Sequence, residues 1–176
     1  TVYNGQVYNG QLNSPGGTIS NGTFNGTVIS NGIITGNGTF EGEVINHAGT
    51  ISGGTFKKKV VNNANGTISD GTFHEKVLNY NGRIANGTFK GDVTNWDKIT
   101  SGTFSTTVTN NYGGTISGGT FAGSVENQGN VTGGVFNDNA NLINVTGGHN
   151  ITWDAASSKA KIEKVNDVPA EWDPYV

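Results

Sequence analysis

The amino-acid sequence predicts an all-β fold, a β-solenoid of about eight stacked coils with about 16 residues in each. Three observations predict it. Phenylalanine recurs every 15 to 17 residues, an aliphatic residue and a valine keep nearly constant distances from it, and a glycine stands two residues before it. All eight phenylalanines belong to this row: Phe24, Phe40, Phe56, Phe73, Phe89, Phe104, Phe121 and Phe136. Because each residue type returns in the same order and is not mirrored, parallel stacking of coils explains the pattern better than hairpins do.

Each coil supplies three apolar side chains to a narrow core. An aliphatic residue precedes phenylalanine by five positions, or by six in one coil: Ile19, Ile34, Ile51, Ile68, Ile84, Ile99, Ile116 and Val131. A valine follows it by four: Val28, Val44, Val60, Val77, Val93, Val108 and Val125. Side chains alternate along a strand, so the asparagine two positions after each valine also points inward. These residues are predicted to form a buried ladder: Asn46, Asn62, Asn79, Asn95, Asn110 and Asn127, with Ser30 in the first copy.

The glycine before each phenylalanine marks a corner of the coil. It usually follows Asn, Asp, Ser or Gly, which tolerate a positive φ or hydrogen-bond to their own backbone. The row comprises Gly22, Gly38, Gly54, Gly71, Gly87, Gly102, Gly119 and Gly134. The density of glycine and the β-branched content exclude a helical fold.

The repeat pattern weakens at both ends of the chain. Residues 1–16 are predicted to form a degenerate N-terminal coil or cap, because a five-residue spacing recurs at Val2, Val7 and Leu12. The solenoid repeats span residues 17–150, and their pattern decays through Leu142, Val145 and Ile151. Residues 151–176 mix Lys, Glu, Pro and Trp unlike the coils, so they are predicted to be a non-repetitive C-terminal cap or linker.

Composition and charge argue against several partners. The formal net charge is −3 and 13% of the residues are charged, with no basic patch for nucleic acid and no polybasic run for an anionic membrane. No apolar run approaches the roughly 20 residues that span a bilayer. Nucleic acid binding and membrane insertion are therefore not expected. The lack of Cys and Met is compatible with an extracellular bacterial protein that uses no disulfides.

Charged residues are predicted to stack in opposite-sign pairs along the outside of the coils. The four pairs are Glu41–Lys57, Glu43–Lys59, Lys58–Glu75 and Lys76–Asp92. Glu41 and Glu43 are the only close acids within the coils, and each has a lysine neighbour, so no catalytic carboxylate pair is predicted. The three histidines, His47, His74 and His149, lie at different registers, and no calcium-binding motif occurs. We therefore expect no catalytic residue, no metal site and no cofactor.

Two outward rows are candidates for a ligand or partner surface. Aromatic residues follow the asparagine row at Tyr80, Trp96 and Tyr112, with His47 close to the same register. They either stack on one another or form an exposed strip suited to sugar rings or to a partner chain. An aliphatic ridge lies beside the inward valines: Ile29, Ile45, Val61 and Leu78. This ridge is predicted to be a self-association surface or to be covered by a terminal segment.

A third outward row consists of hydroxyl residues. Thr-Ile-Ser segments begin at Thr18, Thr50, Thr67 and Thr115, and they resemble the Thr-x-Thr faces of solenoid ice-binding proteins. The row is interrupted by Ile33, Arg83 and Lys98. Threonine is therefore better explained here as a favoured outward β residue, with ice binding as an alternative.

The Gly-Thr-Ile-Ser-Gly-Gly-Thr-Phe units at residues 49–56 and 114–121 recur in related forms over residues 17–136. They resemble the Gly/Thr/Asn-rich tandem repeats of bacterial cell-surface and adhesin-like β-solenoid proteins, over about two thirds of the chain. The resemblance implies an extracellular structural or adhesive module at a bacterial cell surface, with a glycan or a protein of a host or matrix as its partner. Glycan binding by the aromatic row is the first alternative function, and ice binding by the Thr-Ile-Ser face is the second.

Overall fold

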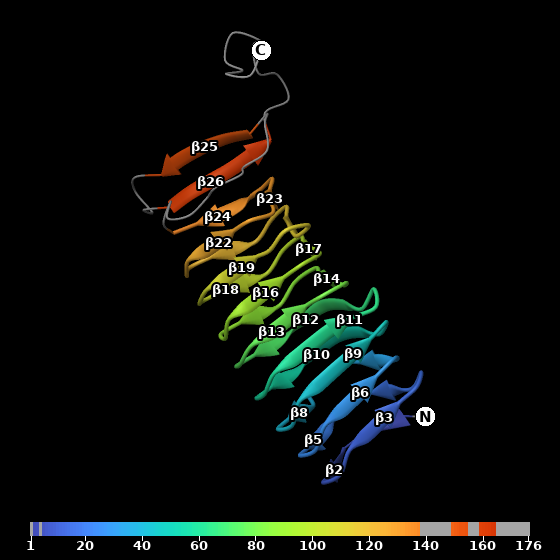
Figure 1. The fold of residues 1–176 in the computed structure, drawn as a ribbon. Helices are drawn as coiled ribbons and strands as arrows, with labels where there is room; N and C mark the ends of the chain where they lie inside the picture. The colour runs from blue at the N-terminus through green and yellow to red at the C-terminus, as the bar shows by residue number, and fades with distance from the viewer. Residues whose placement is uncertain (1, 4, 138–148, 155–158, 165–176) are drawn as a thin grey trace.

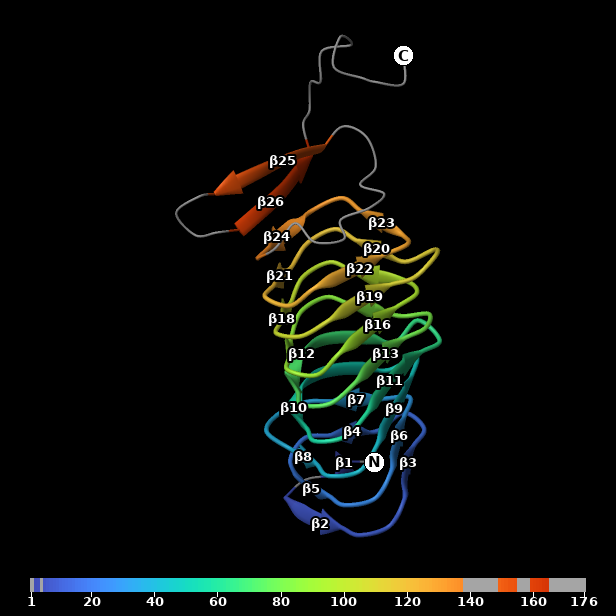
Figure 2. The same cartoon turned by 60° about the vertical axis from the view of Figure 1, so that its left-hand side comes forward.

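A computed structural model describes residues 2–3, 5–137, 149–154 and 159–164 of the chain. It is an all-β solenoid of about eight coils, stacked in sequence order along one axis (Figures 1 and 2). Strands in successive coils pair in parallel, about 16 residues apart. The predicted fold class is therefore confirmed.

Each coil contributes short strands to three columns. The first column follows the Thr-Ile-Ser segments: β1 (Val2–Tyr3), β4 (Thr18–Ile19), β7 (Ile33–Ile34), β14 (Arg83–Ile84), β17 (Lys98–Ile99), β20 (Thr115–Ile116) and β23 (Asn130–Val131). The second follows the phenylalanines: β2 (Gln6–Tyr8), β5 (Gly22–Phe24), β8 (Thr39–Phe40), β15 (Thr88–Phe89), β18 (Thr103–Phe104), β21 (Thr120–Phe121) and β24 (Gly134–Phe136). Two long strands run through both columns: β10 (Thr50–Phe56) and β12 (Thr67–Phe73).

The third column is a separate eight-stranded sheet that follows the Val-x-Asn segments. Its strands are β3 (Leu12–Ser14), β6 (Val28–Ser30), β9 (Val44–His47), β11 (Val60–Asn63), β13 (Val77–Asn79), β16 (Val93–Asn95), β19 (Val108–Asn110) and β22 (Val125–Asn127). Valine pairs with valine and asparagine with asparagine along this sheet, as between β11 and β13. The alternation expected from the sequence is thus kept in register from coil to coil.

The phenylalanines form one continuous aromatic column inside the solenoid. Neighbouring ring centroids lie 4.7–4.8 Å apart, and the ring planes are within 10° of parallel, from Tyr8 to Phe136. Eight such steps carry the column over about 38 Å. In the first coil Tyr8 takes the phenylalanine position, while Val7 pairs with Thr23 and is 64% exposed. The predicted aliphatic, phenylalanine and valine rows are all buried.

Gly71 illustrates why glycine precedes phenylalanine. Its φ is 132°, in the region that favours glycine, and a Cβ there would lie 3.1 Å from a ring carbon of Phe56 and 3.2 Å from one of Phe73. The backbone and the aromatic column therefore both exclude a side chain. The other glycines of the row also have positive φ except Gly38, whose coil has an extra residue and turns at Gly36 with φ 72°.

The buried asparagines form the predicted ladder. The Nδ2 of each asparagine donates to Oδ1 of the asparagine in the next coil at 2.7–2.8 Å, from Asn46 to Asn127. The same amide donates to a carbonyl of its own corner, for example from Asn79 to Gly82 O at 2.8 Å. The ladder thus satisfies polar groups that the corners would otherwise leave buried and unpaired.

Ser30 occupies the ladder position one coil before Asn46, at the N-terminal end of the row. Asn46 Oδ1 is buried and accepts no hydrogen bond from any residue that the structure describes, whereas Ser30 Oγ accepts one from Gly32 N at 3.2 Å. The corner after Ser30 matches the corner after Asn127, because a glycine follows two residues later in both. Asn127 donates to the carbonyl of that glycine at 3.0 Å.

Replacing Ser30 by asparagine should extend the ladder by one rung. We expect the free energy of unfolding to rise by about 1 kcal/mol, because the new amide can donate to Asn46 Oδ1 and to the corner carbonyl. Urea denaturation followed by circular dichroism measures the change. Thr109→Asn, on the outer face of β19, is the matched control and should change stability by less than about 0.5 kcal/mol. A destabilised Ser30→Asn variant would contradict the expectation.

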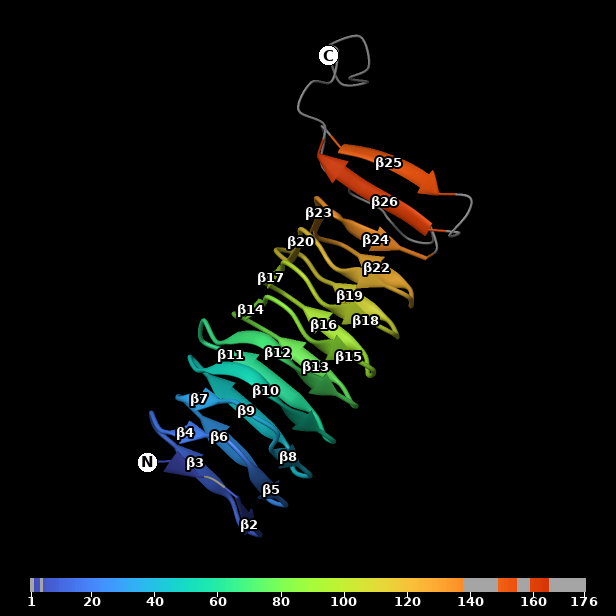
Figure 3. The ribbon, with the colours of Figure 1, turned by 180° about the vertical axis from the view of Figure 1, so that it is seen from behind.

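The end of the repeat array carries a different kind of strand pairing. β25 (His149–Asp154) and β26 (Lys159–Lys164) form an antiparallel hairpin, and β26 pairs antiparallel with β24 (Figure 3). This hairpin occupies an edge of the last coil that would otherwise expose unpaired backbone groups. Leu142, Val145 and residues 165–176 lie outside the described residues.

Candidate functional site

Two of the four predicted charge pairs form ion pairs. Lys59 Nζ lies 3.0 Å from Glu43 Oε1, and Lys58 Nζ lies 3.0 Å from Glu75 Oε1. Within the part of the chain that the structure describes, Glu41–Lys57 and Lys76–Asp92 form no such contact. The side chains of the Lys58–Glu75 pair are about half exposed, so this pair contributes little to stability.

His74 lies between two lysines in the row of residues that directly follow the phenylalanines. His74 N donates to Phe56 O and Lys90 N donates to Phe73 O, which places Lys57, His74 and Lys90 on consecutive coils. Desolvation of the imidazole, together with the positive charges of Lys57 and Lys90, lowers the pKa of His74 below its ordinary value. The imidazole is therefore mainly neutral at pH 7, and no carboxylate of the described residues forms an ion pair with it.

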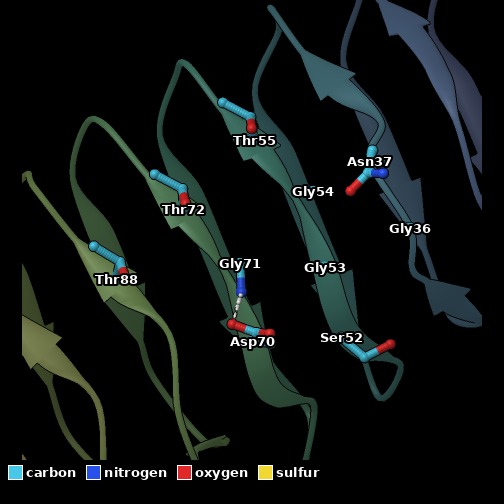
Figure 4. Close-up of a pocket in the computed structure, with 10 residues that line it drawn as sticks. All are labelled: Gly36, Asn37, Ser52, Gly53, Gly54, Thr55, Asp70, Gly71, Thr72 and Thr88. Atoms are coloured by element: carbon cyan, nitrogen blue, oxygen red, sulfur yellow. Dashed lines mark hydrogen bonds between the residues drawn. The ribbon is translucent and has the colours of Figure 1, made fainter.

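A shallow polar groove of about 400 Å³ runs over the first two strand columns (Figure 4). Its floor is backbone at the glycine corners, and threonines of successive coils line one side: Thr55, Thr72 and Thr88. Asp70 is the acidic residue of the groove, and its Oδ1 accepts a hydrogen bond from Gly71 N at 2.8 Å. This groove was not predicted from the sequence; the Gly-Gly and Asp-Gly pairs of β10 and β12 are the signal that could have identified it.

The structure separates two hydroxyl columns. The Thr-Ile-Ser column is interrupted as the sequence indicated, since Thr67 pairs with Arg83 and Arg83 with Lys98. Its serines turn toward the backbone: Ser69 Oγ donates to Ile51 O at 3.2 Å. The uninterrupted column lies instead beside the phenylalanines and was missed from the sequence: Thr23, Thr39, Thr55, Thr72, Thr88, Thr103 and Thr120. The constant Thr-Phe dipeptide was the signal that could have identified it.

Tyr80 and Trp96 are the stacked members of the aromatic row. Their ring centroids lie 4.6 Å apart with an interplanar angle of 18°, and Tyr80 is 46% exposed. Tyr112 does not continue the stack, because Asn111 N donates to Asn95 O and so takes the position next to Trp96. Tyr112 lies one residue farther along a longer corner and is 79% exposed.

The aliphatic ridge is an outward row of the third strand column. Ile29 pairs with Ile45, Ile45 with Val61, and Val61 with Leu78, and the row then continues with Thr94. Val61, in the middle of the ridge, is only 9% exposed, while the other three are half-buried. An apolar hollow of about 500 Å³ adjoins the ridge and is lined by Ile29, Asn31, His47, Ala48 and Ala64.

Other kinds of site are not found among the residues that the structure describes. No group of three His, Asp or Glu side chains is placed to hold a metal ion there. In the same part of the chain, no helix has the length and apolar character needed to cross a lipid bilayer. The chain matches no protein-family model, no curated protein and no solved structure.

Proposed function

We propose that this chain is a non-catalytic structural or adhesive module, displayed outside the cell on a bacterial surface. The proposal rests on the continuity of the internal columns: stacked rings run from Tyr8 to Phe136, and amide hydrogen bonds run from Asn46 to Asn127. Each coil of a solenoid contacts its neighbours only, so such columns keep one shape along the whole array. A rod of this kind can hold a binding surface away from its point of attachment.

The outward residues can differ from coil to coil while the core stays the same, so we assign the adhesive role to them. The ridge row holds isoleucine on β6 but Thr94, Thr109 and Glu126 on later coils, with the same strand register throughout. Polar and apolar residues are thus interchangeable on this face without loss of the fold. The proposed partner is a glycan or a protein of a host or matrix.

The module is tested by placing the chain between a surface anchor and an epitope on a heterologous bacterium. We expect the epitope to survive protease treatment that removes it from a strain carrying a flexible Gly-Ser linker of equal length, because paired and buried backbone resists cleavage. Flow cytometry measures the epitope that is retained. Phe73→Ala is the matched variant and should lose protection. Equal loss from the unmodified chain and the flexible linker would contradict the proposal.

Glycan binding through the aromatic row is the second candidate. It is favoured by the Tyr80–Trp96 stack, which leaves Tyr80 about half exposed, and by the exposed ring of Tyr112. A partly exposed aromatic ring offers an apolar face on which the C–H side of a sugar ring can pack. Tyr80 and Trp96 offer one continuous surface, whereas Tyr112 offers a separate one.

A glycan array with the full chain tests this second candidate. We expect Tyr80→Ala and Trp96→Ala each to weaken binding by about 2- to 12-fold, because each removes a stacking contact of about 0.5–1.5 kcal/mol. Thr88→Ala, on another face of the solenoid, is the control and should bind as the unmodified chain does. Unchanged binding by the Tyr80→Ala/Trp96→Ala double variant would remove this row from consideration.

A further inference from the structure

The outer face of the third strand column carries three parallel rows of side chains. The residues before the inward valines form a charged row: Glu43, Lys59, Lys76 and Asp92. The aliphatic ridge forms the middle row: Ile29, Ile45, Val61 and Leu78. The residues after the inward asparagines form the third row: Asn31, His47, Asn63, Tyr80 and Trp96. Each row advances by one residue per coil, so the face is a regular grid.

The ridge is symmetric about one point of this grid. Its four members lie on β6, β9, β11 and β13, with Asn13 on the strand before and Thr94 on the strand after. The midpoint therefore lies between β9 and β11. A two-fold axis at this midpoint, parallel to the strands, places Ile29 opposite Leu78 of a second copy and Ile45 opposite Val61 of that copy.

The same axis also places opposite charges of the charged row against each other. It places Glu43 of one copy opposite Lys59 of the other, and the reverse. Glu43 and Lys59 already lie 3.0 Å apart within one chain, so two copies form a cluster of four charges with alternating sign. An axis one coil farther along would oppose Lys59 to Lys76 and Glu43 to Asp92, and like charges in contact oppose association. Charge and apolar complementarity thus select the same axis.

In the third row, the same axis brings the exposed ring of Tyr80 in one copy close to the apolar hollow of the other copy. The axis sets β13 of one copy opposite β6 of the other, so Tyr80 lies opposite Asn31. Asn31 borders the apolar hollow, which Ile29, His47, Ala48 and Ala64 also line. Tyr80 is 46% exposed and is held by its stack on Trp96. A ring fixed in this way can enter the hollow with little loss of side-chain entropy.

From these three matches we propose that two copies of this chain bind face to face as an antiparallel dimer, with the two-fold axis between β9 and β11. The grid covers the six strands from β3 to β16, about 4.8 Å apart, and spans five residues of each coil at about 3.3 Å each, which gives roughly 500 Å² per copy. The pair buries about 1,000 Å², which is near the lower limit for a specific interface, so association is in the micromolar range. The dimer is independent of the structural or adhesive role proposed above.

Sedimentation velocity of the full chain over about 5–200 µM tests the dimer. We expect the weight-average mass to rise from 18.3 kDa toward twice that value. Lys59→Glu and Ile45→Lys should each weaken association at least about 10-fold, and the swap Glu43→Lys/Lys59→Glu should restore it to within about 3-fold. Thr109→Lys lies in the ridge row outside the six strands and should associate as the unmodified chain does. Circular dichroism confirms that each variant is folded.

Cross-linking of introduced thiols tests the antiparallel register, because the chain has no cysteine of its own. Thr27 precedes β6 and Lys76 precedes β13, so the axis places them opposite each other. We expect a bis-maleimide that spans about 10 Å to link Thr27→Cys chains to Lys76→Cys chains when the two are mixed in equal amounts, because facing sheets lie about that far apart. Thr27→Cys alone should give no linked product, since its two copies are also three coils, about 14 Å, apart along the solenoid axis.

Three results would overturn the dimer. The first is a constant mass of 18.3 kDa over the whole concentration range. The second is loss of association in Thr109→Lys equal to that in Ile45→Lys, which would place the contact on another surface. The third is a cross-linked product from Thr27→Cys alone without the mixed product, which would exclude the register. None of these results affects protease protection of the epitope, so the dimer and the structural module fail separately.

Discussion

Replacing Phe73 by alanine is expected to lower the free energy of unfolding by about 3–5 kcal/mol. Phe73 is fully buried, and its ring stacks on Phe56 at 4.7 Å and on Phe89 at 4.8 Å. Removing the ring leaves a cavity between two rings that are fixed by their own coils. The neighbouring glycine corners have no side chains that could fill it. The variant therefore loses the full transfer free energy of the ring and also bears the full cost of the cavity.

Equilibrium denaturation in urea, followed by circular dichroism, measures this loss. Thr72→Ala is the matched control, because Thr72 precedes Phe73 on the same strand and points outward. It should change the free energy of unfolding by less than about 0.5 kcal/mol. A loss below about 1 kcal/mol in Phe73→Ala would show that the aromatic column is not a main source of stability.

Replacing Asn79 by alanine should have an effect of similar size through hydrogen bonding. Asn79 accepts from Asn62 Nδ2 and donates to Asn95 Oδ1 and to Gly82 O, at 2.7–2.8 Å in each case. Alanine removes all three bonds and leaves the second Nδ2–H of Asn62 buried without an acceptor, although Asn62 keeps its bond to Gly66 O. Three lost bonds at about 1 kcal/mol each, with the added cost of the unpaired donor, give an expected loss of at least about 3 kcal/mol.

Asn46→Ala is the internal control for Asn79→Ala. Asn46 makes the same two donations, to Asn62 Oδ1 and to Gly49 O, but among the described residues none donates to its own Oδ1. Its removal should therefore destabilise the chain less than the removal of Asn79 does, by about 1 kcal/mol. Urea denaturation of both variants under the same conditions measures the difference. Equal losses would show that the hydrogen bond accepted by Asn79 Oδ1 adds nothing to stability.

The inward half of this structure could be predicted from the sequence because two local rules define it. Side chains alternate along a strand, so the distance of a residue from phenylalanine decides whether it points inward. Parallel stacking then brings each residue onto its counterpart in the next coil. Phe73, Asn79 and Val77 therefore occupy the predicted rows, and Gly71 has the positive φ expected at a corner.

The corners and the ends could not be predicted in the same way. Corners differ in length, so sequence spacing does not decide which corner residue stays in the row. Asn111, rather than Tyr112, follows Trp96 in the row for this reason. In the first coil the order Val-Tyr replaces Thr-Phe, so the apolar spacing did not reveal that Tyr8 continues the aromatic column.

By itself, the sequence determined the solenoid and its inward rows, because periodicity and alternation are local properties of the chain. Only the tertiary structure decided which outward residues are neighbours. The uninterrupted threonine column, the Tyr80–Trp96 stack and the ridge centred between β9 and β11 all depend on how successive coils align. That alignment is a property of the stacked coils together, since inter-coil hydrogen bonds and the buried columns define it.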